Sequence, residues 1–186
     1  MPPKVKITKE DIIKTAIDIV RDKGADAINA RNIASVLNCS TQPIFFNFDN
    51  MEELKLAAVA EAERIFEEFM NKEIGKGEYP AYKASGMAYI RFAFEEKELF
   101  KLLYMRDRTH ENINEVSELN NRMKNMVKDN VELSDDKAQL FHLEIWAYVH
   151  GIATMLATSY LQFDFSFISK MITDVYQGLK KQFEGD

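Results

Sequence analysis

The stretch from Asn29 to Leu54, NARNIASVLNCSTQPIFFNFDNMEEL, decides the fold of this chain. Its pattern predicts two very short helices joined by a tight turn and followed by the start of a long helix. Short helices are rarely stable alone, because nucleation is costly and each added residue contributes little. Two short helices in one small unit usually serve to present one side of the second helix to a partner. The usual partner is the major groove of DNA.

Capping residues predict where the helices around this stretch begin and end. Thr8 is a good N-cap for a first helix that runs to about Lys23, and Gly24 ends it. Asn29 caps a second helix over about 30–37.

The third helix begins after a turn, with Ser40 or Thr41 as its cap and Pro43 in its first turn, and ends near Phe48. Apolar periodicity then predicts helices over about 50–74, 80–94, 97–105, 112–131, 134–161 and 164–183. The expected fold is therefore all-α, with about nine helices. We expect a head over 1–50 and a larger body over 51–186.

Composition excludes several protein classes. Apolar residues make up 46% of the 186 residues, which is ample for a packed core. No run of about 18 apolar residues is present, so no membrane span is expected. The charged N-terminal stretch does not resemble a secretory signal, and the single cysteine, Cys39, cannot form an internal disulfide. These features predict a cytoplasmic protein.

The charge is unevenly distributed along the chain. Residues 1–50 hold seven basic and six acidic side chains, a net of +1, whereas the remainder holds 17 basic and 24 acidic, a net of −7. A nearly neutral head on an acidic body is compatible with a small DNA-reading unit on a body that DNA avoids.

Small and apolar residues are placed in the head as a helix-turn-helix requires. Ala34 is small where two helices would cross, Cys39 is a small apolar residue in the turn, and Ile44 is expected to point into the core. This arrangement lets the second helix of the motif stand clear of the body.

Residues 8–60 resemble the DNA-binding head of the TetR (tetracycline repressor) family of bacterial regulators. The residues that match are Ile12, Ala16, Gly24, Arg31-Asn32-Ile33-Ala34, Cys39-Ser40, Phe45, Phe48 and Glu53-Leu54. The resemblance implies an all-helical homodimer, with a three-helix head in each subunit and a variable ligand-binding body.

Two positions depart from the family pattern. Phe45 stands where the family usually has Tyr, and Met51 stands where it usually has Lys. Both family residues commonly contact DNA phosphates, so their loss weakens the sequence-independent part of binding. The residues expected to compensate are Asn47, Lys55 and the N-terminal Lys4, Lys6 and Lys9.

The predicted recognition helix contains no Lys or Arg, so other side chains must read the bases. Gln42 can pair with adenine, and Thr41, Pro43 and Phe46 can touch thymine methyl groups. The hydroxyl group and free N–H groups at Thr41 can also bind a phosphate. These residues predict an operator whose core is rich in A·T pairs. Arg31 is expected to contact a phosphate or a guanine, or else to be a solvated cation at a helix start.

The body contains one helix that is apolar nearly all round, Phe141–Tyr160. Gly151 lies mid-helix, at a cost of about 1 kcal/mol relative to Ala, which a close helix crossing would offset. Trp146 and His150-Gly151 resemble a Trp-His-Gly signature of one class of TetR C-terminal domains. The family resemblance implies dimerisation through the last two helices, about 137–161 and 165–183.

Large side chains of the body, nearly all apolar, are candidates to line a ligand pocket, although plain core packing is the simpler explanation for each one taken singly. They are Phe66, Phe69, Met87, Ile90, Phe94, Leu103, Met105, Trp146, His150 and Met155. Among them His150 is the polar group expected to meet a ligand, although a buried histidine whose hydrogen bonds are satisfied within the protein is the simpler explanation. His142 and His150 are poorly placed as a metal pair, so neither a metal nor another cofactor is expected.

Three hypotheses of function follow. The first is a ligand-responsive transcriptional repressor that binds a near-palindromic DNA operator as a homodimer and is released by a small apolar effector. The second is a protein-interaction adaptor whose head no longer binds DNA. The third is a helical-bundle enzyme, which is disfavoured because the chain has no HExxH, no paired Glu-x-x-His and no glycine-rich phosphate loop.

Overall fold

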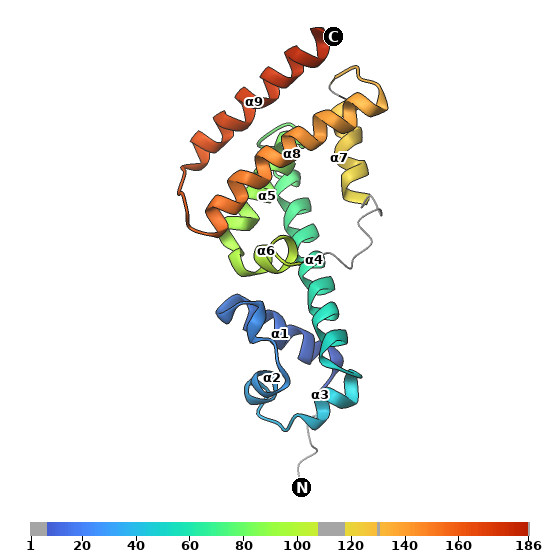
Figure 1. Ribbon diagram of the computed structural model, residues 1–186, viewed down its shortest axis with the longest axis vertical. Helices are drawn as coiled ribbons and strands as arrows, with labels where there is room; N and C mark the ends of the chain where they lie inside the picture. The colour runs from blue at the N-terminus through green and yellow to red at the C-terminus, as the bar shows by residue number, and fades with distance from the viewer. Residues whose placement is uncertain (1–6, 108–117, 130, 186) are drawn as a thin grey trace. The chain divides into compact units, whose positions relative to one another are not determined.

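The computed structural model describes residues 7–107, 118–129 and 131–185. Within these residues the chain forms nine α-helices and one short 3-10 helix, and no β-strand, as the sequence predicts. The helices are shown in Figure 1: α1 (Lys9–Lys23), η1 (Ala25–Ala27), α2 (Ala30–Val36), α3 (Gln42–Asn47), α4 (Met51–Gly75), α5 (Ala81–Glu95), α6 (Lys97–Tyr104), α7 (Glu118–Lys128), α8 (Asp135–Ala157) and α9 (Phe165–Gly185). No helix in the described part of the chain is long and apolar enough to cross a membrane.

The helices form two compact units. The first consists of Met1–Glu68 and Glu96–Arg106, and the second of Phe69–Glu95 and Asp107–Asp186. Helix α4 contributes its N-terminal part to the first unit and its C-terminal part to the second, and α6 belongs to the first. The head predicted over 1–50 lies within the first unit, and its boundary at residue 50 stays a prediction.

Helix α1 begins with a capping box. The Thr8 hydroxyl accepts a hydrogen bond from the Asp11 N–H, and the Asp11 carboxylate accepts one from the Thr8 N–H. The Thr8 N–H and the Thr8 hydroxyl group both donate to this carboxylate, which lowers the pKa of Asp11. The helix ends at Gly24, whose φ of +80° lies in the region that favours glycine. Both predicted ends of this helix are confirmed.

The core of the first unit lies where α1 contacts α2, α3 and α6. The side chains in it are apolar and almost without exposed surface: Ile12, Ala16, Val20, Ile33, Ile44, Leu54, Leu99 and Phe100. Helix α6 therefore completes the core of the unit that contains the short helices.

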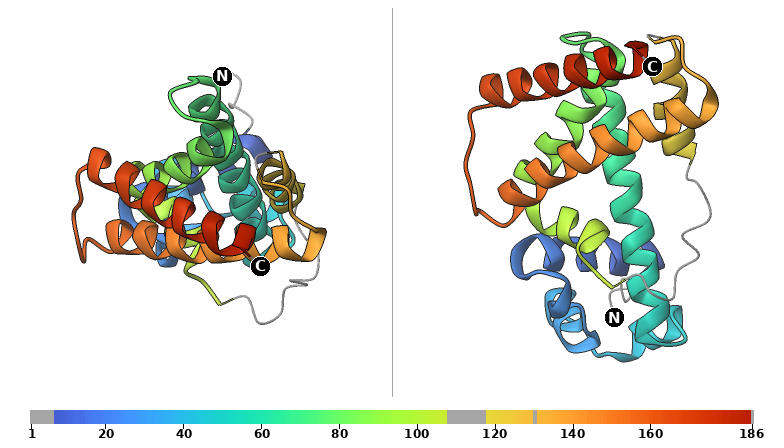
Figure 2. Two further views of the ribbon diagram at one scale, coloured as in Figure 1. Left: turned by 90° about the horizontal axis from the view of Figure 1, so that it is seen from above. Right: turned by 45° about the horizontal axis from the view of Figure 1, so that its top comes forward.

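The second unit is built around the packing of α5 along α8. Helix α7 contacts both of these helices, and so does α9. Helices α8 and α9 run antiparallel beside each other (Figure 2). Phe92, Phe141 and Ile168 are fully buried in this unit.

Helix α8 ends at Ala157 and not near Leu161, as the apolar pattern predicted. Ser159 takes a positive φ of +56°, and the Thr158 hydroxyl donates a hydrogen bond to the carbonyl oxygen of Thr154. No glycine or proline marks this end, so the sequence gives no signal for it. The predicted helix over 112–131 corresponds to α7, and residues 112–117 lie outside the described residues.

Candidate nucleic-acid interface

Helices α2 and α3 form a helix-turn-helix. The Cys39 N–H donates to the carbonyl oxygen of Ala34 at 2.9 Å, and Asn38 takes a positive φ of +50°, which Asn tolerates better than most residues. Ala34 and Ile44 are buried, as predicted. The Asn29 side chain accepts from the Asn32 N–H at 2.9 Å, which confirms the predicted N-cap of α2.

The start of α3 differs from the prediction in one respect. Thr41 occupies the N-cap position, but it has helical φ and ψ and its side chain makes no capping hydrogen bond. Pro43 lies in the first turn, as predicted.

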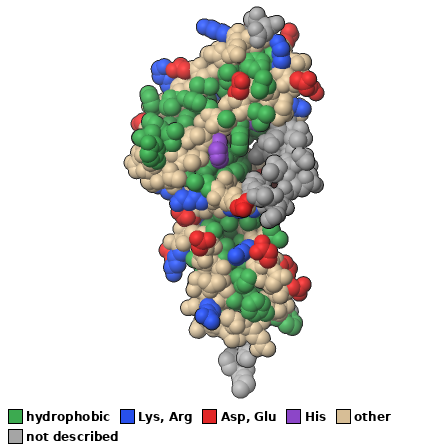
Figure 3. All heavy atoms as spheres, viewed as in Figure 1, with side chains coloured by type: hydrophobic (Ala, Val, Ile, Leu, Met, Phe, Trp, Pro, Cys, Tyr) green, Lys and Arg blue, Asp and Glu red, His purple; other side chains and the backbone are tan. Residues whose placement is uncertain are grey.

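One face of α3 is buried in the core, and the opposite face is exposed to solvent. Ile44 is fully buried, whereas Phe45 is 51% exposed and Phe46 is 86% exposed. Figure 3 shows hydrophobic side chains at the surface over α3. Gln42 is exposed as well. The Asn47 side-chain amide donates to the carbonyl oxygen of Pro43 at 2.8 Å. Gln42, Phe45 and Phe46 are therefore the exposed side chains of α3, and Phe46 is the more exposed of the two rings.

The start of α4 is capped by Asn50. Its side-chain oxygen accepts from the Glu53 N–H at 2.9 Å, and the Glu53 carboxylate accepts from the Asp49 N–H at 2.8 Å. Met51 follows directly and is half-buried.

Half of the six cations over residues 7–60 are paired with acidic side chains: Lys9, Arg21 and Lys23. Lys9 pairs with Glu53 at 2.9 Å, and its ammonium group lies 4.5 Å from the centre of the Phe48 ring. Lys9 is also one of the predicted phosphate contacts, and its ion pair with Glu53 would compete with binding to a phosphate. Over residues 7–60, the cations without an ion pair are Lys14, Arg31 and Lys55. The predicted contacts Lys4 and Lys6 lie outside the described residues.

The predicted pocket residues fall in both compact units. Phe66 and Leu103 are buried in the first unit. Met87 and Ile90 are buried in the second unit, where Phe94 is 44% exposed and Trp146 is 41% exposed. Core packing accounts for the buried residues. The rings of Phe94 and Trp146 are partly exposed to solvent, so they do not line an enclosed cavity. Their roles in ligand binding stay predictions.

His150 is the centre of a small aromatic group in the second unit. Its Nδ1 lies 2.9 Å from the hydroxyl oxygen of Tyr89, and its ring stacks on Trp146 with 5.0 Å between centroids and 14° between planes. Burial lowers the pKa of His150. If a ligand displaced the Tyr89 hydroxyl group, the neutral imidazole could form one hydrogen bond to the ligand in place of the bond to Tyr89.

A second pair of the same kind, Tyr82 and His142, was not identified from the sequence. The Tyr82 hydroxyl oxygen lies 3.1 Å from His142 Nδ1, and both side chains are buried. The two tyrosines are seven residues apart in α5, and the two histidines are eight apart in α8. Both spacings are close to two helical turns, which is the signal that could have revealed the pairs.

The described residues contain no cluster of three or more potential metal ligands. One open groove in the second unit lies between the α7–α8 connection and the end of α9, and none of the predicted pocket residues lines it. Its lining residues are Val131, Glu132, Leu133, Ser134, Lys137, Phe183 and Glu184.

Known proteins resemble the chain mainly in structure. Residues 82–173 match the family model for the tetracyclin repressor-like C-terminal domain. No curated protein matches the sequence. This domain match covers the centre of the second unit and includes α6 of the first.

Solved structures match over nearly the whole chain. A TetR-like transcriptional regulator from Rhodococcus sp. RHA1 aligns with a TM-score of 0.68 and 12% identity, covering 95% of this chain and 96% of that one. A TetR family member from Streptomyces coelicolor A3 gives 0.65 and 14%, covering 90% and 96%. A multidrug binding protein in complex with imidazole gives 0.61 and 15%, covering 90% and 93%. The chain thus has the fold of TetR-like transcriptional regulators.

Proposed function

We propose that this chain is a ligand-responsive DNA-binding regulator of the TetR family, acting as a repressor in the bacterial cytoplasm. The observation that carries the proposal is the helix-turn-helix of α2 and α3, whose second helix leaves Gln42 and Phe46 exposed. It occurs in a chain whose fold follows TetR-like regulators over 95% of its length.

The proposed active form is a homodimer that places two heads in successive major grooves of a near-palindromic operator. Half-sites would then be about 34–36 Å apart, or a multiple of that distance. Exposed apolar side chains on the last two helices support a dimer formed there. Leu140 and Leu143 of α8 and Phe167 of α9 are each about half exposed, and burying them against a second copy is favourable.

The proposed effector is a small apolar molecule bound by the second unit. The exposed Trp146 ring and the neighbouring His150 offer an apolar surface and one polar group, which is the usual composition of a small-molecule site. The structural relative that binds multiple drugs is compatible with an effector of this class. The effector would release DNA by binding more tightly to the conformation that does not fit the operator.

A gel-shift assay with genomic fragments, repeated at several salt concentrations, tests the proposal. We expect retarded fragments whose affinity falls as salt rises, because phosphate contacts release counterions. Gln42→Ala should weaken the shift, whereas Gln162→Ala, at an exposed glutamine between α8 and α9, should leave it unchanged. Absence of any salt-sensitive binding would exclude this function.

A second candidate function is a protein-interaction adaptor, and one specific observation favours it. Helix α3 has no Lys or Arg, and its most exposed large apolar side chain is Phe46. Such a surface also suits an apolar protein partner. The same gel shift separates the two functions, since an adaptor would retain no DNA even at low salt.

A further inference from the structure

We infer that Gln42 and Phe46 together read two neighbouring A·T pairs, and that operator binding depends on the 5-methyl group of a thymine beside Phe46. This inference rests on the proposed function and specifies what the head recognises.

The two side chains lie on one side of α3, four residues apart. Residues at this spacing in a helix have Cβ atoms about 5–6 Å apart. Successive base pairs rise by about 3.4 Å. Side chains so spaced reach base pairs that are one or two steps apart, so one short helix can read a contiguous pair of positions.

The neighbouring residues of α3 are less able to read bases. Ile44 is fully buried, and the Asn47 amide donates to the carbonyl oxygen of Pro43. Phe45 is the other exposed ring, but it is the less exposed of the two, at 51% against 86% for Phe46.

The chemistry of the two side chains suits adenine and thymine. The Gln42 amide has one donor and one acceptor group, which match N6 and N7 of adenine in the major groove. The Phe46 ring has neither group, so it gains only from apolar contact. Thymine alone among the four bases carries a methyl group on its major-groove edge.

The weak positive charge of the head increases the share of binding that must come from this contact. Only Lys14, Arg31 and Lys55 lack an ion pair over residues 7–60. With only these three unpaired cations over residues 7–60, burial of the Phe46 ring against a methyl group becomes a larger fraction of the affinity. Loss of one buried methyl group corresponds to an affinity about four-fold lower.

The experiment uses the full-length protein and a pool of random DNA duplexes. After selection of bound sequences, each thymine of one enriched duplex is replaced in turn by deoxyuridine, which removes the methyl group and keeps the base pair. For the unmodified protein we expect a loss of about four-fold at one thymine in each half-site.

Three variants assign the effect to its side chain. Phe46→Ala should bind the thymine and deoxyuridine duplexes equally, and Phe45→Ala, the matched control, should keep the difference between them. Gln42→Ala should keep the methyl effect and lose discrimination at an adjacent A·T pair. Circular dichroism melting checks that each variant is folded, which is expected for Phe46→Ala because its ring is largely exposed.

Two results would overturn the inference in different ways. DNA binding that is indifferent to deoxyuridine, or a Phe46→Ala variant that still distinguishes the two duplexes, refutes methyl reading and leaves the proposed function intact. Failure to enrich any duplex refutes the proposed function itself, and the inference with it.

Discussion

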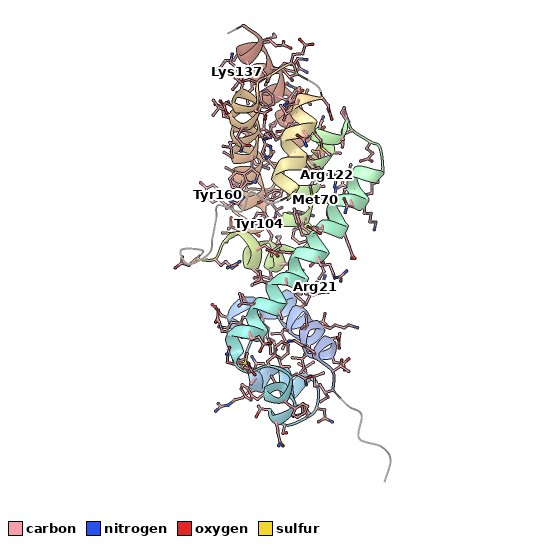
Figure 4. All side chains as sticks on the ribbon, turned by 90° about the vertical axis from the view of Figure 1, so that its right-hand side faces the viewer. Arg21, Met70, Tyr104, Arg122, Lys137 and Tyr160 are labelled. Atoms are coloured by element: carbon pink, nitrogen blue, oxygen red, sulfur yellow. The ribbon has the colours of Figure 1, made fainter. Side chains whose placement is uncertain are left out.

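Arg21 and Glu96 are joined by two parallel hydrogen bonds. Arg21 Nε lies 2.9 Å from one carboxylate oxygen of Glu96, and Nη2 lies 2.8 Å from the other. Arg21 is in the last turn of α1, and Glu96 is the residue before α6 (Arg21 is labelled in Figure 4). Hydrogen bonding to Glu96 raises the pKa of Arg21. The pair fixes α6 against the helix that supports the helix-turn-helix.

Replacing Glu96 by Gln should therefore destabilise the first unit. The charge-assisted bidentate bond would be lost while the side-chain shape is kept. Both groups are partly exposed, so we expect a fall of about 1 kcal/mol in the free energy of unfolding, measured by urea titration. Asp18→Asn is the matched control, because Asp18 lies 3.9 Å from Arg21 and should contribute little. Equal effects of the two variants would contradict a specific role for Glu96.

Local features of the fold were predictable because their causes lie within a few residues. Thr8, Asn29 and Ser134 are N-caps whose side chains accept from backbone N–H groups three residues later. Their short polar side chains favour that geometry wherever they precede an apolar periodic segment. Gly24 ends α1 for the equally local reason that φ is positive there.

Features that depend on distant residues were not predictable. Arg21 and Glu96 are 75 residues apart, so nothing near α6 indicates that it packs in the first unit. The hydrogen bond between Tyr82 and His142 depends in the same way on how α5 and α8 align. The DNA-contact residues were predicted from their residue types and from the family resemblance. The structure shows which of them are exposed, and it shows that Lys9 is paired with Glu53.

The cations of the head should differ in what they contribute. Lys55→Ala and Arg31→Ala should each reduce the slope of log affinity against log salt by about 0.9 if the residue contacts a phosphate, with little change in stability. Lys9→Ala should instead lower the free energy of unfolding slightly, through loss of the exposed Glu53 pair and the Phe48 contact. Gel shifts at five salt concentrations and urea titrations give both quantities. A Lys9 variant that changes only the salt slope would show that this lysine leaves Glu53 for DNA.

Stability should fall as the pH is lowered through the ordinary range of histidine. Burial lowers the pKa of His142 below its usual 6.5, so the folded state holds it neutral while the unfolded chain takes up a proton. The unfolded state therefore binds more protons below about pH 6.5, and the free energy of unfolding decreases from there toward pH 5. Tyr82, which is hydrogen-bonded to His142, and Tyr176, whose ring contacts Tyr82, have pKa values raised by burial and do not titrate in this window.

Thermal melting of His142→Gln between pH 5 and 8 measures this contribution. Glutamine can still hydrogen-bond to Tyr82 but does not titrate, so the pH dependence should become flatter. His150→Gln should act in the same direction, since burial lowers the pKa of His150 as well. If a variant that carries both substitutions shows the same change of melting temperature with pH as the unmodified protein, then other groups cause the pH dependence.

Gly151 offers a test of the proposed dimer. It lies within α8, where glycine is less favourable than alanine by about 1 kcal/mol. The close helix crossing expected at this position is not found among the described residues, because no atom of another helix lies within 4 Å of where a Cβ would be. Gly151→Ala should then stabilise an isolated chain. If α8 of a second copy approaches there, the same methyl group would overpack the interface and weaken the dimer by about ten-fold or more.

We expect the second effect, a dimer dissociation constant raised in Gly151→Ala, measured by sedimentation over a dilution series. Gly75→Ala is the matched control, because Gly75 ends α4 and a Cβ there also meets open space. The control should leave the dissociation constant unchanged. A Gly151 variant that dimerises as strongly as the unmodified chain, and melts at a higher temperature, would mean that the open space beside Gly151 is filled by solvent and that the dimer forms through another surface.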